Sequence, residues 1–271
     1  MRGHVRAAAI AAGLCLAASS VLAQPSGVTK DEVKCESGTG KALSKFVGKK
    51  SKCGTKCFQT ARKTMGPYTG CFAPYTDPAT NTCIMDPIKG AEQKARNSIV
   101  KACTADCPEC YAASNCSTGE PFVGNTENLV DLQGPNVYCV ENGGNTPSKT
   151  DAKCEDGTAK ALAKFVASKG KCYDKCNQNI FKAKIPDGSC DPPTPTDPTG
   201  ATQACLSKAE SKGAATIDKV CFIPPATAPS CYDGSGFRPN SGQGWVDLVE
   251  MVVDSQIPII ACGSPSGAFL E

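Results

Sequence analysis

Cysteine is the residue type with the most chemical potential in this chain. The 271 residues include 19 cysteines. The motif Cys107-Pro-Glu-Cys110 has the CxxC spacing of thiol oxidoreductases, where a helix start lowers the pKa of the first thiol. Here the motif follows a predicted helix instead of opening one, and the sequence contains it once. We therefore interpret Cys107–Cys110 as a structural disulfide, with a thiol redox protein as the alternative.

The first 23 residues have the pattern of a cleaved secretory signal. Arg2 and Arg6 give a positive start, an apolar run follows from 7 to 18, and the small residue Ala23 precedes the expected cleavage point. The apolar run is too short to span a bilayer. We expect a secreted or periplasmic protein, with no integral membrane segment once the signal is removed.

Loss of the signal changes the chemistry that remains. It removes Cys15, which leaves 18 of the 19 cysteines, and it removes His4, the only histidine. An even, dense set of cysteines in an exported chain indicates a disulfide framework. Without histidine, Ser-His-Asp catalysis, Cys-His catalysis and histidine-ligated metals are excluded for the mature chain. We predict no catalytic residue, cofactor or metal, and keep a carboxylate-based hydrolase as an alternative enzyme class.

A stretch of 23 residues occurs twice. Cys35–Cys57 and Cys154–Cys176 are identical at 15 of 23 positions, at a constant offset of 119 residues. Both copies place cysteine and apolar residues on a narrow stripe at helical spacing, so each predicts a long helix. Gly38, matched by Gly157, weakens a helix interior by about 1 kcal/mol, which would move the helix start to about Thr39.

The repeated stretch predicts a mainly α fold built from two tandem homologous modules. Each would be a disulfide-stapled α-hairpin with long irregular loops rich in Pro and Gly. The boundaries are a polar leader at 24–30, module 1 at 31–140, a linker at 141–149 and module 2 at 150–271.

Module 1 is expected to begin with a helix that ends near Met65. A loop at 68–85 would follow, and then an antiparallel second helix with Asp86 as its N-cap and Pro87 as its first residue. An irregular tail would hold Cys116 and Cys139.

Module 2 repeats this plan. It predicts helices at about 151–184 and 202–221, joined through the proline-rich loop 191–200. An apolar segment around Trp245 predicts a third, shorter helix in the core of the module.

The hairpin geometry also predicts the cysteine partners. Two cross-links between antiparallel helices need similar separations along each helix, and the loop cysteine then takes the remaining helical one. The predicted pairs are Cys35–Cys103, Cys53–Cys83, Cys57–Cys71, Cys107–Cys110, Cys116–Cys139, Cys154–Cys221, Cys172–Cys205, Cys176–Cys190 and Cys231–Cys262. An exchange of partners between Cys53 and Cys57 fits the spacing nearly as well.

Lysines on the two repeated helices are the candidate binding residues. They are Lys41, Lys45, Lys49, Lys52, Lys56, Lys160, Lys164, Lys171 and Lys175. A basic helix face suits an anionic cell-surface polymer, and equally keeps an exported protein soluble. Aromatic residues are not interleaved with the lysines, which argues against nucleic acid. We predict an exported cysteine-rich structural or binding protein.

Overall fold

The structure is a computed structural model that describes residues 28–65, 68–139, 148–234 and 237–262. This part of the chain forms eight α-helices, one short 3-10 helix (η1, Thr69–Cys71) and no β-strand. The prediction of a mainly α-helical fold is therefore confirmed. The predicted signal at 1–23 and most of the 141–149 linker lie outside the described residues.

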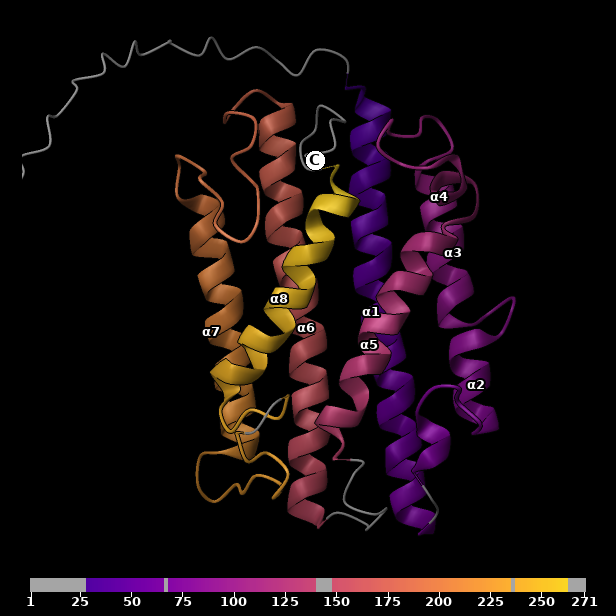
Figure 1. Ribbon diagram of the computed structural model, residues 1–271, viewed down its shortest axis with the longest axis vertical. Helices are drawn as coiled ribbons and strands as arrows, with labels where there is room; N and C mark the ends of the chain where they lie inside the picture. The colour runs from indigo at the N-terminus through magenta and orange to yellow at the C-terminus, as the bar shows by residue number, and fades with distance from the viewer. Residues whose placement is uncertain (1–27, 66–67, 140–147, 235–236, 263–271) are drawn as a thin grey trace, which may run out of the picture.

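The helices form two layers (Figure 1). The first layer holds, side by side, α7 (Ala201–Cys221), α6 (Lys149–Phe181), α1 (Lys30–Thr64) and α3 (Ala91–Ala102). The second layer holds α5 (Glu120–Val137) and α8 (Gly242–Ile260), which cross one face of α1 and α6. Since α1 and α6 are antiparallel, Gln59 near the end of α1 donates a hydrogen bond to Asp156 near the start of α6.

Both central helices begin with a capping box. The Thr29 hydroxyl accepts a hydrogen bond from the amide of Glu32, whose carboxylate accepts one from the amide of Thr29. Ser148 and Asp151 form the same pair at the start of α6. Each box satisfies two amides that would otherwise have no partner. α1 ends at Thr64, near the predicted end, whereas α6 ends at Phe181, three residues before the prediction.

The prediction that the first helix begins near Thr39 is wrong, because α1 passes through Gly38 without a break. A Cβ on Gly38 would lie 2.3 Å from Cβ of Ala102 in α3. A Cβ on Gly157 would similarly lie 2.7 Å from Cγ2 of Val220 in α7. At both places glycine allows the neighbouring helix to approach closely, and this packing outweighs its poor helix propensity.

The predicted loop at 68–85 contains a helix, α2 (Pro78–Met85), whose N-cap is Asp77. The second long helix of the predicted hairpin also begins later than expected, with Gly90 as the N-cap of α3. The carboxylate of Asp86 instead accepts hydrogen bonds from the amides of two following residues and holds a tight turn. The Asp-Pro pair that does cap a helix is Asp77-Pro78, at the start of α2.

The predicted irregular tail of module 1 is also wrong. It contains the short helix α4 (Ala113–Thr118) and the 18-residue helix α5. Glycine and proline made this segment a poor helix in sequence, with Pro135 inside its last turn. Its partner α8 is longer than predicted, at 19 residues, and carries Pro258 at the matching place.

Nine disulfides link the described cysteines. Six join the cysteines of the long helices and their loops in the pairs predicted from spacing: Cys35–Cys103, Cys53–Cys83, Cys57–Cys71, Cys154–Cys221, Cys172–Cys205 and Cys176–Cys190. The exchange between Cys53 and Cys57 does not occur. Each bond ties α1 or α6 to the helix or loop beside it.

The three remaining predicted pairs are wrong. Cys107–Cys110, Cys116–Cys139 and Cys231–Cys262 do not form, and the bonds are Cys107–Cys116, Cys110–Cys262 and Cys139–Cys231. Two of them join the first half of the chain to the second.

A tyrosine next to each of these two disulfides shows why the bonds join the two halves of the chain. Tyr111, next to Cys110, donates to the carbonyl of Ile260 at the end of α8. Tyr232, next to Cys231, donates over 2.7 Å to the carbonyl of Val137 at the end of α5. Each tail therefore closes on the other half of the chain, which the assumption of self-contained modules had excluded.

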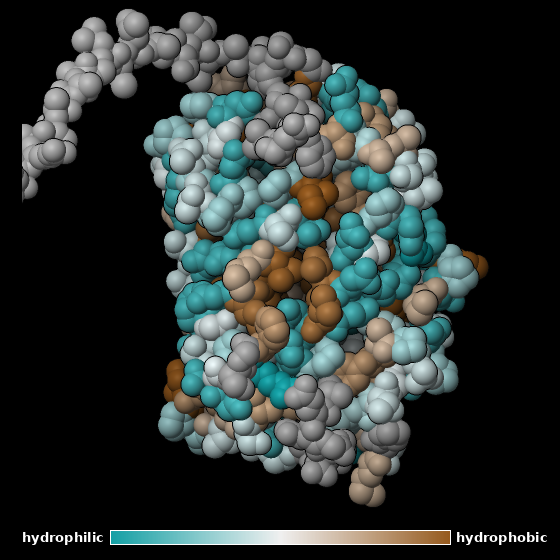
Figure 2. Space-filling model, viewed as in Figure 1, coloured by the Kyte–Doolittle hydropathy of each residue, from teal (hydrophilic) through white to brown (hydrophobic). Residues whose placement is uncertain are grey.

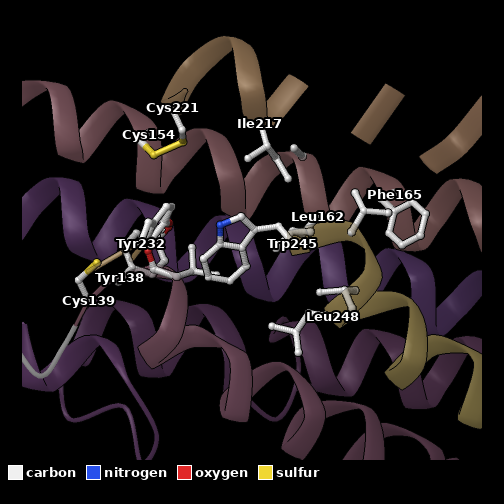
Figure 3. Packing of buried hydrophobic residues seen from close by; sticks show 14 of the residues in the cluster. Tyr138, Cys139, Cys154, Leu162, Phe165, Ile217, Cys221, Tyr232, Trp245 and Leu248 are labelled. Atoms are coloured by element: carbon white, nitrogen blue, oxygen red, sulfur yellow. Dashed lines mark hydrogen bonds between the residues drawn. A yellow bond between two sulfur atoms is a disulfide. The ribbon is translucent and has the colours of Figure 1, made fainter. Parts of the chain in front are cut away.

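Trp245 lies in the core, as predicted, with no exposed surface. Its ring packs against Tyr232, with 4.8 Å between centroids, and Leu162 and Leu248 lie on its other sides (Figure 3). No helix in the described part of the chain is long and apolar enough to cross a membrane.

Candidate functional site

A groove lies between α5 and α8, with α1 and α6 as its floor. It encloses about 230 Å³. On α1 its lining extends from Val33 to Phe58, a distance of about 37 Å along the helix at 1.5 Å per residue. Hydrophobic residues gather in the middle of this face and hydrophilic ones surround them (Figure 2). The site is therefore long, narrow and apolar.

Small residues make the floor. Those on α1 are Gly40, Ser44, Val47, Ser51 and Gly54, and those on α6 are Ala159, Ala163, Val166 and Gly170. Small side chains allow α1 and α6 to pack closely while they leave space above the contact. A Cβ on Gly170, for example, would come within 3.2 Å of the Ser44 hydroxyl.

The two walls present the same residue types. Val130 and Gln133 line the groove from α5, and Val253 and Gln256 line it from α8. These residues belong to a pattern, E-x-x-V-D-x-Q-x-P, that occurs at 127–135 and again at 250–258. One Gln133 oxygen is buried without a hydrogen-bond partner among the described residues.

A buried lysine ties α5 to the floor. Lys50 of α1 is 2% exposed, and its Nζ lies 2.5 Å from Glu127 Oε1 and 2.8 Å from Asp131 Oδ1. The Tyr75 hydroxyl donates to the same Asp131, and its ring centroid lies 5.0 Å from Nζ. Two carboxylates and an aromatic ring therefore surround one ammonium group.

The same cluster recurs under α8. Lys169 of α6 is 1% exposed and pairs with Glu250 and, at 2.7 Å, with Asp254. Tyr173 donates to Asp254 over 3.5 Å. Lys169 stands where Lys50 stands in the repeated sequence, so both walls are attached in one way.

A third carboxyl group adjoins each cluster. Burial and the charge of Glu127 raise the pKa of Glu92, and burial and the charge of Glu250 raise the pKa of Glu210. Both rises have the same cause, because each carboxyl is partly buried next to a carboxylate that is already bound to lysine, and Arg96, 3.0 Å from Glu92, opposes the rise there. The acidic groups thus serve to hold helices together, and this use gives no support to the carboxylate-hydrolase alternative.

Glu36 lines the groove at the end near Ile260. The residue is 5% exposed, and its Oε1 has no hydrogen-bond partner among the described residues. Burial, and secondarily the charge of Glu32, raises its pKa from 4.5 to about 8. Glu155, at the matching place in α6, also has a pKa raised to about 8 by burial, but the Arg62 guanidinium lies 3.8 Å from it.

The CPEC motif loses its redox interpretation in this structure. Cys107 bonds Cys116 and Cys110 bonds Cys262, so the two cysteines of the motif do not form a dithiol–disulfide couple with each other.

The nine predicted lysines are all exposed. On α1, Lys45 and its neighbours on the stripe project roughly 145° around the helix from the groove lining, at 100° per residue. The α1 lysines therefore point away from the groove, although Lys41 lies 3.4 Å from Asp174, a residue of α6 that lines it. Binding by this stripe remains a prediction.

Sequence reasoning missed the groove, Lys50, Lys169 and the buried glutamates. Identity between the two copies was not a sufficient signal, because the exposed lysines at 41, 45, 52 and 56 are repeated as well. The signal was position: Lys50 and Glu36, like Lys169 and Glu155, fall on the helix side that carries the buried apolar residues, which indicates a buried charged group.

Comparison of the chain with models of protein families, with curated proteins and with solved structures finds no match. The site is therefore interpreted from its own geometry.

Proposed function

We propose that this is an exported, disulfide-stabilised binding protein that holds a small apolar molecule with a long chain in the groove between α5 and α8. The observation that carries the proposal is the groove itself, with apolar walls and a floor of small residues. Binding sites for small molecules are mostly apolar concavities with a few placed polar groups. The dense disulfides support the export that the first 23 residues predict.

The cross-links support a groove that exists before the ligand arrives. Cys110–Cys262 holds the end of α8, and Cys139–Cys231 follows the end of α5. Lys50 and Lys169 hold the middle of the same helices. Walls that do not need to be ordered on binding reduce the entropic cost of capturing a ligand.

We further propose that the groove lies on a twofold axis between two duplicated modules, 31–140 and 150–271. The matching pairs support this: Cys110 meets Cys262 while Cys231 meets Cys139, and each adjacent tyrosine bonds the end of the opposite wall helix. Such reciprocity is the mark of an isologous contact, here within one chain. A chain of this kind gains a groove at the junction that neither module has alone.

The groove can be tested with methyl cis-parinarate, an uncharged fluorescent fatty ester, and the oxidised protein. We expect the wild type to bind the probe with increased fluorescence. Val130→Trp should weaken binding at least tenfold, because the indole fills the groove between the walls. Leu132→Trp is the matched control, since Leu132 lies two residues along α5 and is 67% exposed.

Three results would contradict the proposal. The first is no binding by the wild type, and the second is equal binding by both tryptophan variants. The third is binding only after residues 264–271 are removed, which would mean that the groove receives the chain's own end.

The lysine stripe supports a second candidate role, docking of the opposite face on an anionic cell-surface polymer. We expect the protein to bind immobilised heparin and Lys45→Glu/Lys52→Glu/Lys164→Glu to elute at clearly lower salt. The charge-matched control is Lys89→Glu/Lys94→Glu/Lys101→Glu, three lysines outside α1 and α6. Equal shifts in both variants would reduce the effect to net charge.

A further inference from the structure

Glu36 is a buried acid with no cation beside it among the described residues. It lies in the groove lining close to Ile260 and Ala261, at the end of α8. The ionisable groups that influence it are Glu32 on its own helix, which repels its charge, and Tyr111, whose hydroxyl donates elsewhere. Among the described residues it forms no ion pair and its Oε1 has no hydrogen bond. Such groups concentrate at functional sites.

Its counterpart Glu155 shows what is missing. Arg62 approaches Glu155 and binds the adjacent Asp156 with two hydrogen bonds, of 3.1 and 2.8 Å. At the same offset of 119 residues, the position that corresponds to Arg62 is Phe181. The two equivalent buried carboxyls therefore have different neighbours: Glu155 has a guanidinium beside it, and Glu36 lines the groove.

We propose that the groove takes a cationic amphiphile, with an ammonium group that pairs with Glu36 and an apolar chain that lies along the groove toward Phe58. This inference rests on the proposed function and names its ligand class. Charge complementarity is the argument, because the ligand would supply the cation that Arg62 supplies at Glu155. The ammonium group also gives both carboxylate oxygens a hydrogen-bond donor.

Proton exchange follows from this pairing. Burial keeps the Glu36 carboxyl protonated at neutral pH, since its pKa is raised to about 8. An ammonium group hydrogen-bonded to Glu36 favours the carboxylate. The Arg62 guanidinium opposes the rise at Glu155 only in part, because it lies 3.8 Å away and donates its hydrogen bonds to Asp156. The carboxyl therefore gives its proton to the solvent as the ion pair forms, and one proton is released for each cation bound near pH 7.

The experiment compares dodecylamine, dodecanol and dodecanoic acid by titration calorimetry, each below its critical micelle concentration. We expect the wild type to bind dodecylamine at least tenfold more tightly than dodecanol, and dodecanoic acid less tightly than dodecylamine. Repetition in buffers of different ionisation enthalpy should show proton release for the amine alone. Glu36→Gln should abolish the preference for amine and the proton release, and keep dodecanol binding.

The matched control is Glu155→Gln, which changes the equivalent carboxyl outside the groove and should keep the preference for amine. Equal binding of all three molecules, a preference for the acid, or an amine preference that survives Glu36→Gln would overturn the inference and leave the proposed function standing. Binding of none of the three would overturn both. The buffer dependence in the wild type needs no variant, so a misfolded variant does not decide the outcome.

Discussion

Above pH 8, replacement of Glu36 by Gln is expected to stabilise the ligand-free protein by about 5 kcal/mol more than it does below pH 4.5. Burial raises the pKa of Glu36 from 4.5 to about 8. A difference of one in pKa between the folded and unfolded states corresponds to about 1.4 kcal/mol, and glutamine has the same shape without a proton to hold. Denaturant unfolding of wild type and variant at several pH values measures the difference.

The sign of the pH dependence follows from proton binding. Below about pH 4.5 the folded and unfolded states both hold the Glu36 proton, so the carboxyl adds no pH-dependent cost. Between 4.5 and about 8 the unfolded state loses the proton while the folded state keeps it. The free energy of unfolding of the wild type therefore falls as the pH rises through this window, and stays level above it.

Glu155→Gln provides the comparison within the same chain. The pKa of Glu155 is also raised to about 8, but the Arg62 guanidinium opposes the rise and would lose one of its two carboxyl partners on substitution, keeping Asp156. We expect a smaller stabilisation than for Glu36→Gln. A Glu36→Gln variant whose added stability did not change with pH would show that Glu36 is ionised in the folded state at neutral pH.

A gain of this size would show that the native residue reduces stability. Functional sites commonly retain residues that a stability criterion alone would replace. If Glu36→Gln stabilises the protein and also loses the preference for dodecylamine, the two measurements together assign the buried carboxyl to ligand binding.

Local spacing was enough to predict the long helices and the disulfides within each half of the chain. Cys35–Cys103 and Cys53–Cys83 follow from the fact that an antiparallel pair of helices fixes two separations at once. Glycine at position 38 was misinterpreted, because propensity describes a helix in isolation and not its contact with Ala102.

The contacts between the halves could not be obtained from spacing. Cys110, not Cys116, corresponds to Cys231, as the tyrosine that follows both Cys110 and Cys231 indicates. Even with that correspondence, every cysteine finds a partner whether the tail cysteines pair within each half or between the halves, so the sequence does not decide between the two. The choice depends on where α5 and α8 cross the floor, and therefore on tertiary packing. The groove between α5 and α8 also depends on this packing, and spacing could not predict it for the same reason.

Replacement of Lys50 by Met is expected to lower the free energy of unfolding by about 3–5 kcal/mol at pH 7, because it leaves two partly buried carboxylates without their cation. Nζ of Lys50 lies within 2.8 Å of both Glu127 and Asp131, and the side chain is 2% exposed. Methionine has nearly the same length, so the loss reports charge and hydrogen bonding more than volume. Lys49→Met, at the adjacent exposed position, should change stability by no more than about 0.5 kcal/mol.

The partner residues allow the cause to be separated. Lys50→Met combined with Glu127→Gln and Asp131→Asn removes the unpaired charges, and we expect it to recover most of the loss. Lys169→Met should destabilise the protein by a similar amount, since Lys169 is 1% exposed and contacts Glu250 and Asp254 in the same way. If the triple variant were no more stable than Lys50→Met, the cluster would act through its packing. If Lys50→Met cost no more than Lys49→Met, α5 would be held by its disulfide and apolar contacts alone, and the lysine would have no part in fixing the wall of the groove.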